Sequence, residues 1–185
     1  MCIRDRLGTI TSRDDYIEKH INKILKLESV DKVGIQNSKF KIVVDGINSI
    51  GGVAIPKLLD SLNVEVVKIN CNPNGNFAHD PEPLAENLRE LCDAVLENNA
   101  DLGIAVDPDV DRLVFVDEKG KLFSEEYTLV ACADYILSQH KGKTVSNLSS
   151  TRALSDVTKK YGQSYFASAV GELNVVKEMK KVSAV

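Results

Sequence analysis

Apolar residues along this chain alternate between two spacings, one typical of short buried strands and the other typical of helices. Strands are expected at residues 40–45, 64–70, 101–106 and 113–116. Helices are expected at residues 14–27, 51–62, 84–95 and 125–139. Strands that alternate with helices are typical of an α/β fold with a mainly parallel, mixed sheet. Region 40–139 is therefore predicted to form one complete domain.

A second alternation of the same kind follows a short linker at residues 140–143. It is expected to contain strands at 144–148 and 164–167, helices at 151–160 and 172–181, and the opening of a further strand at 182–185. Region 140–185 is thus predicted to be the start of a second, similar α/β domain that is cut short. Residues 13–39 are interpreted as a helix and linker from a preceding domain junction, and residues 1–12 show no pattern.

Composition excludes several classes of protein. Among 185 residues, 23 basic and 27 acidic side chains give a net charge of −4, so nucleic acid is not expected as a partner. No apolar run approaches the roughly 20 residues that a membrane span needs. Charges among the first six residues do not fit a secretory signal, and we expect a cytoplasmic protein. The four cysteines lie far apart and do not match a zinc site.

The strongest chemical signal is the segment DPDVDR at residues 107–112, between two expected strands. It places Asp107, Asp109 and Asp111 at alternate positions. Sites made only of oxygen ligands suit hard cations such as Mg²⁺, and ligands gather at the carboxyl ends of parallel strands. A solvated acidic turn is the simplest alternative, but three clustered anions repel one another without a counter-ion. The segment therefore predicts a Mg²⁺ site.

The spacing of these acidic residues also permits other interpretations of the segment. An EF-hand loop fits three acidic positions, but it requires Gly where Arg112 stands and helices where strands are expected. A phosphatase that forms an aspartyl-phosphate would use Asp107 as nucleophile and Asp109 as acid/base, although no paired Asp follows for its Mg²⁺. A stand-alone Mg²⁺- or sugar-phosphate-binding module is a further alternative.

Two other segments are weaker candidates. The Gly-rich loop at residues 46–52 lies between a strand and a helix, where amide groups could cradle a phosphate, but it lacks the spacing of a P-loop. We interpret it as a tight turn. His79 beside Asp80 could act as a general base, although a histidine that packs within its loop is more common.

Several segments together resemble one family. DPDVDR at 107–112, VDGINSIGG at 44–52, NGNF at 74–77 and VGELNVV at 170–176 are similar, in the same order, to segments of the α-D-phosphohexomutases. This group contains the phosphoglucomutases, phosphomannomutases and phosphoglucosamine mutases. The resemblance runs from about residue 14 to residue 185, and the acidic loop is its most specific part.

The resemblance implies both a fold and an activity. Such enzymes have four domains around a cleft, and this chain resembles the second domain and the start of the third. They move phosphate reversibly between C1 and C6 of a hexose through a phosphoserine and a bisphosphate intermediate. By this resemblance, Asp107, Asp109 and Asp111 would hold Mg²⁺. The hexose phosphate substrate would be contacted by Arg112, Gly171 and Glu172.

The sequence also departs from the family pattern. The phosphoserine of such enzymes lies in a Ser-His-Asn-Pro type of loop, and none of His20, His79 and His140 follows a Ser. We therefore expect no catalytic nucleophile in this chain, which would depend on the missing domains of its parent and be inactive alone. Ser149 stands where some relatives carry a Lys, so no acid/base role is carried onto it.

Overall fold

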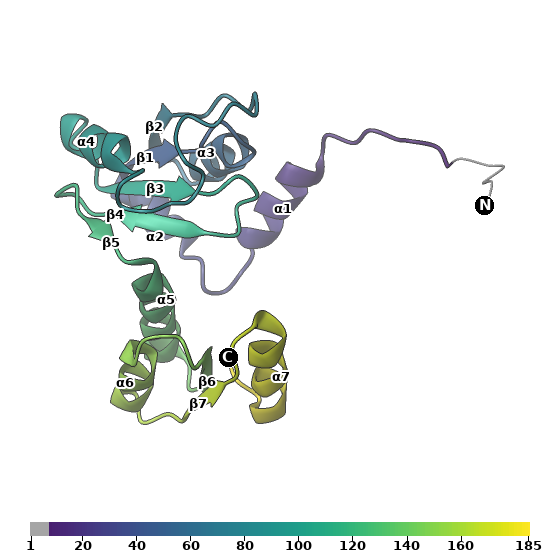
Figure 1. Ribbon diagram of the computed structural model, residues 1–185, viewed down its shortest axis with the longest axis vertical. Coiled ribbons are helices and arrows are strands. Elements are labelled where there is room, and N and C mark those ends of the chain that lie inside the picture. Colours follow the sequence, from purple (N-terminus) through teal and green to yellow (C-terminus); the bar gives the residue numbers. More distant parts are fainter. Residues whose placement is uncertain (1–7) are drawn as a thin grey trace.

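A computed structural model of the chain describes residues 8–185 and contains two sheets that follow one another in sequence (Figure 1). The unpatterned segment 1–12 therefore lies in part outside the described residues. The first sheet has the strand order β2-β1-β3-β4-β5. Its strands are β1 (Lys41–Asp45), β2 (Glu65–Ile69), β3 (Leu102–Val106), β4 (Leu113–Val116) and β5 (Leu122–Phe123). β1 pairs in parallel with β2 and β3, whereas β4 and β5 are antiparallel, so the expected mixed, mainly parallel sheet is confirmed.

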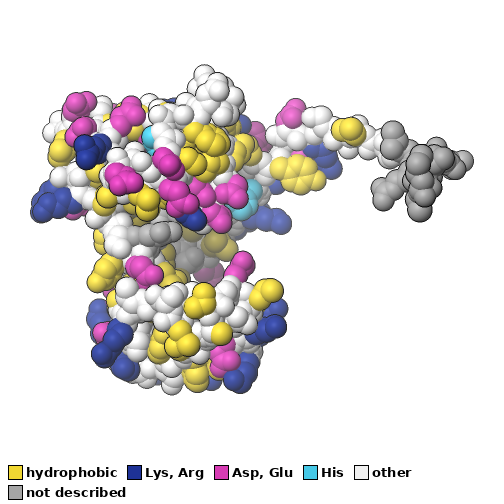
Figure 2. Space-filling view, viewed as in Figure 1, with side chains coloured by type: hydrophobic (Ala, Val, Ile, Leu, Met, Phe, Trp, Pro, Cys, Tyr) yellow, Lys and Arg dark blue, Asp and Glu magenta, His cyan; other side chains and the backbone are white. Residues whose placement is uncertain are grey.

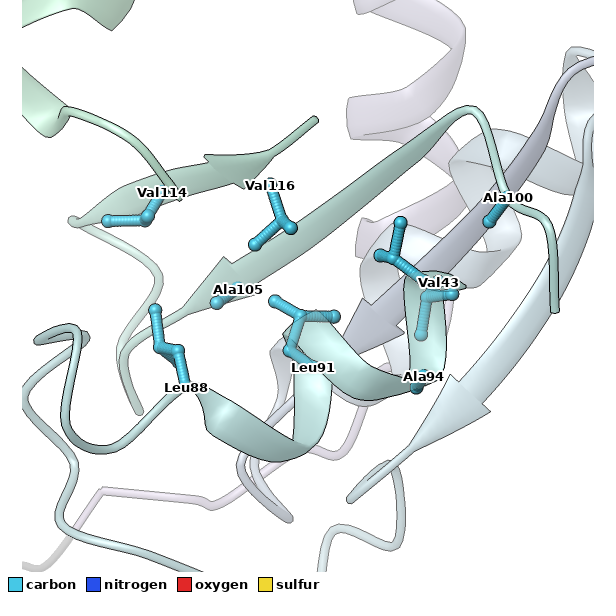
Figure 3. Close-up of a cluster of buried hydrophobic side chains, with 9 residues drawn as sticks. Val43, Leu88, Leu91, Ala94, Ala100, Ala105, Val114 and Val116 are labelled. Atoms are coloured by element: carbon cyan, nitrogen blue, oxygen red, sulfur yellow. The ribbon is translucent and has the colours of Figure 1, made fainter. Parts of the chain in front are cut away.

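Helices cover both faces of this sheet. The side of α4 (Arg89–Glu97) forms a core in which Leu91 packs with Val43 and Val116 (Figure 3). The opposite side, covered by α3 (Gly51–Ser61), holds a second core that includes Ile42 and Val44. Successive residues of β1 thus face opposite cores, and this two-sided burial explains why the strand is apolar without alternation.

The second sheet is smaller. It contains two parallel strands, β6 (Thr144–Asn147) and β7 (Tyr165–Ser168), and Ala184 makes a single parallel bridge to Lys143 beside β6. Its helices are α5 (Glu125–Gln139), α6 (Ala153–Lys160) and α7 (Glu172–Val182). Within residues 8–185, no helix combines the length and apolar character needed to cross a bilayer. The prediction of a second α/β alternation is confirmed.

The structure differs from the expected elements mainly at their ends. The helix expected from residue 84 begins at Arg89, because residues 84–87 form a turn in which Asn87 donates its backbone N–H to the Leu84 carbonyl. The expected helix at 14–27 is shorter, as α1 (Tyr16–Ile24). α2 (Lys32–Ser38) was not expected, since none of its residues is fully buried and it has no apolar stripe. Asp31 caps it by accepting a hydrogen bond from the Gly34 N–H at 2.9 Å.

Replacing Leu91 by Ala should destabilise the first sheet strongly. Leu91 is fully buried between α4 and the sheet, and losing its side chain leaves a cavity. We expect the free energy of unfolding to fall by about 2–5 kcal/mol, measured by urea denaturation followed by circular dichroism. Leu96→Ala in the same helix, at a side chain that is 51% exposed, is the control and should cost less than about 1 kcal/mol. Equal losses in the two variants would contradict this core assignment.

Candidate functional site

The acidic loop at residues 107–112 joins the carboxyl end of β3 to β4 by a tight turn. One carboxylate oxygen of Asp107 accepts hydrogen bonds from the backbone N–H groups of Asp111 and Arg112, both at 3.0 Å. Val110 adopts a positive φ of 63°, which is costly for a β-branched residue. Ser49 supports the turn from outside, because its hydroxyl donates to the Pro108 carbonyl at 2.6 Å. The loop is therefore held in shape by contacts from within and from a neighbouring segment.

The turn brings the three predicted metal ligands together. One carboxylate oxygen from each of Asp107, Asp109 and Asp111 lies within 4.8 Å of the others. Asp107 is buried, whereas Asp109 and Asp111 are exposed. Figure 2 shows acidic side chains gathered on the face of the molecule where this loop lies. Because strands rather than helices flank the loop, the EF-hand interpretation is wrong.

The carboxyl groups of the loop shift one another's pKa values. Burial alone would raise the pKa of Asp107, but hydrogen bonds from the backbone of Arg112 and from neighbouring groups of the loop outweigh burial and lower it. The pKa of Asp111 is raised by its hydrogen bond with Asp107 and by the negative charges of Asp107 and Asp109. Asp111 therefore carries the effect of the unbalanced negative charge, which a bound cation would relieve.

Arg112 leaves the same loop and meets a second segment of the chain. Its guanidinium donates a hydrogen bond to the carboxylate of Glu82, in the turn-rich loop at residues 72–83. Both side chains are about half exposed. Pro81, Glu82 and Arg112 line a cavity of about 360 Å³ with residues of the acidic loop. The structure thus brings the predicted Arg112 and the predicted metal ligands into one site.

Gly171 and Glu172, the other predicted substrate contacts, lie in the second sheet region. Gly171 has a φ of 113°, which favours glycine, and directly precedes α7. Glu172 is the first residue of that helix and is exposed. These two residues therefore belong to a different α/β unit from the acidic loop.

In the Gly-rich loop at residues 46–52, Gly46 and Gly52 lie very close to each other, and Gly52 lies very close to Cys71. A Cβ atom on Gly46 would lie 2.3 Å from the Cα of Gly52. A Cβ atom on Gly52 would lie 2.6 Å from the Cα of Cys71. Side chains would not fit at either position, so the geometry agrees with the interpretation as a tight turn.

Sequence reasoning missed the partner of His79. The His79 Nε2 atom lies 3.1 Å from the carboxylate of Asp45, the last residue of β1, which is only 1% exposed. The Asp45 carboxylate also accepts from the Ile47 N–H at 3.0 Å and from the Asn70 side chain at 3.3 Å. Asp45 ends an apolar run at the carboxyl edge of the sheet, as Asp107 nearly does, and that position is the signal that could have identified it.

Comparison with known proteins gives consistent results. A family model described as phosphoglucomutase/phosphomannomutase, alpha/beta/alpha domain II, matches residues 14–120, and the corresponding domain III model matches residues 124–185. A "probable phosphoglucosamine mutase" of Methanopyrus kandleri is 30% identical over 183 residues, covering 98% of this chain and 39% of the relative. A "phosphoglucomutase/phosphomannomutase" of Thermococcus kodakarensis is 34% identical over 169 residues, covering 90% of this chain and 37% of the relative.

The fold is also found in solved structures. A phosphoglucomutase/phosphomannomutase family protein from Burkholderia thailandensis superposes with a TM-score of 0.77 at 24% identity, covering 91% of this chain and 36% of that protein. The chain thus spans less than two fifths of the length of each of these three relatives. Because the two family models match residues 14–120 and 124–185, the chain belongs to the phosphoglucomutase/phosphomannomutase family, whose named relatives are mutase enzymes.

Proposed function

We propose that this chain supplies the metal-binding segment of a Mg²⁺-dependent phosphohexomutase. The parent enzyme would move phosphate between C1 and C6 of glucose, mannose or glucosamine phosphate, through an enzyme phosphoserine and a bisphosphate intermediate. The observation that supports this most is the convergence of three carboxylates beside Arg112, in a loop at the carboxyl end of β3. The family match leaves the aspartyl-phosphate phosphatase without support.

The donor set fits Mg²⁺. All three groups offer oxygen, their oxygens lie within 4.8 Å of one another, and the raised pKa of Asp111 reflects charge that a dication would balance. When bound, Mg²⁺ offsets charge on the transferring phosphoryl group. Hydrogen bonds from the loop backbone orient the Asp107 carboxylate, so this ligand needs little reorganisation on binding.

The remaining residues would bind the substrate. The guanidinium of Arg112 has the planar donor geometry that suits phosphate oxygens, and it lines the same cavity as the carboxylates. We propose that Gly171 and Glu172 contact the hexose phosphate from the second α/β unit. The phosphoserine would come from another domain of the parent enzyme, because no Ser stands directly before a His in these 185 residues, as the Ser-His-Asn-Pro type of loop requires.

Replacing Asp109 by Asn should weaken Mg²⁺ binding to the purified chain. The change removes one of three converging charges at an exposed position, so we expect the dissociation constant measured by calorimetry to rise about tenfold. Glu118→Gln removes the same charge from an exposed turn outside the triad and serves as the matched control. If both variants bind Mg²⁺ as tightly as the unmodified chain, the carboxylates do not form the site.

Mg²⁺ binding should also depend on pH. Since the pKa of Asp111 is raised, this side chain takes up a proton at a higher pH than an ordinary aspartate, whose pKa is about 3.9. Protons then compete with Mg²⁺, and we expect affinity to fall as the pH is lowered from neutrality, in titrations at a series of pH values. Asp111→Asn should bind more weakly throughout and lose the upper part of this dependence. A pH profile that is the same in both proteins would argue against the assignment.

The purified chain alone should not convert glucose 1-phosphate to glucose 6-phosphate. Without a phosphoserine the metal loop has no phosphoryl donor to act on. A coupled assay for glucose 6-phosphate, with and without added glucose 1,6-bisphosphate, is expected to stay at background. Conversion that disappears in the Asp109→Asn variant would show that this chain is catalytically sufficient and would overturn the proposal.

A further inference from the structure

We propose that His79, held by the buried carboxylate of Asp45, is a positioning residue for the metal loop. It fixes the loop at residues 72–83 so that Glu82 holds the guanidinium of Arg112 at the edge of the acidic site. This inference rests on the proposed function for the meaning of the site, but its geometry stands on contacts of its own.

The Asp45 carboxylate is a strong anchor for His79. Burying a carboxylate is costly unless hydrogen bonds replace its water, and Asp45 is 1% exposed. Its oxygens accept from the backbone N–H of Ile47 and from the side chains of Asn70 and His79. His79 comes from the 72–83 loop and is itself largely buried, with 16% of its side chain exposed. Removing it would leave the buried carboxylate with fewer donors, so the loop is tied firmly to the end of β1.

Each nitrogen of the His79 ring contacts a different part of the chain. His79 Nδ1 lies 2.8 Å from the backbone carbonyl oxygen of Asp80, which can only accept, so Nδ1 carries a hydrogen. His79 Nε2 lies 3.1 Å from the Asp45 oxygen that already accepts from Asn70. The ring therefore bridges the backbone of its own loop and the carboxylate at the end of β1, and uses both of its nitrogens to do so.

Local hydrogen bonds connect the position of His79 to that of Glu82. The Asp80 side chain accepts a hydrogen bond from the Glu82 N–H at 3.2 Å, and the Glu82 carbonyl accepts from the Asn87 side chain at 2.8 Å. Pro81 lies between Asp80 and Glu82 and fixes its own φ. The three residues after His79 thus have little freedom, and the position of the His79 ring sets the position of the Glu82 backbone.

The ion pair of Glu82 with Arg112 needs such an anchor. Both side chains are about half exposed, and an ion pair of this kind contributes little on its own. Its geometry must therefore come from the loop that carries Glu82. With Glu82 in place, one carboxylate outside the triad binds the guanidinium. If Glu82 moves, the Arg112 charge is expected to shift toward Asp109 and Asp111 and compete with Mg²⁺ there.

The test compares His79→Ala with Glu82→Gln in the full 185-residue chain. In each variant we expect the Arg112 Nε–H signal to shift in a ¹H–¹⁵N spectrum and the Mg²⁺ dissociation constant to rise by up to about tenfold. The double variant should lose no more than either single change, because His79 acts through Glu82. His140→Ala, after the end of α5, and Glu86→Gln, in the turn before α4, change exposed positions and are the matched controls.

Two readouts keep this inference separate from the proposed function. Asp45→Asn, which removes one charged acceptor from the His79 contact, should shift the Arg112 Nε–H signal in the same direction as His79→Ala. An Arg112 signal that does not respond to His79→Ala or Asp45→Asn, or additive losses in the double variant, would overturn the positioning role. If Mg²⁺ fails to bind the unmodified chain while the Arg112 signal still responds to His79→Ala, the proposed function fails and the positioning role stands. If His79→Ala unfolds, Asp45→Asn, alone and combined with Glu82→Gln, carries the same comparison.

Discussion

The site depends on how three like charges are kept within 4.8 Å of one another. Repulsion between them would open a flexible loop, yet this turn is closed by hydrogen bonds that the Asp107 carboxylate accepts from its own backbone. Asp107 follows β3 directly and is 8% exposed, so little water competes for those bonds. The remaining repulsion raises the pKa of the exposed Asp111, which can take up either a proton or a cation.

The same sheet edge carries a second buried carboxylate. Asp45 ends β1 opposite Ala105 of β3, so Asp45 and Asp107 lie at the ends of neighbouring parallel strands at one edge. Asp45 is surrounded by donors from the protein, whereas Asp107 shares its surroundings with two further carboxylates. One carboxylate thus organises the loops around the site, and the other belongs to the site itself.

Local features of the chain were predictable and distant ones were not. The apolar pattern of the strands and the spacing of the acidic residues can both be read within short stretches of sequence. The mixed sheet agrees with the first pattern, and the convergence of Asp107, Asp109 and Asp111 agrees with the second. α2 gave no signal because none of its residues is fully buried and only Ile35 packs against the second core. The pairs Asp45–His79 and Glu82–Arg112 join residues 34 and 30 positions apart. No periodicity encodes such pairs, since they depend on how a turn-rich loop folds back over the sheet.

This difference also bears on how the site is assembled. The acidic loop needs only the end of β3 and the start of β4, so its shape is set within six residues. Arg112 needs a loop anchored elsewhere, and Gly171 and Glu172 need a second sheet. The proposed metal ligands thus depend on one loop, and the proposed phosphate contact depends on two loops. The proposed sugar contact depends on a second α/β unit.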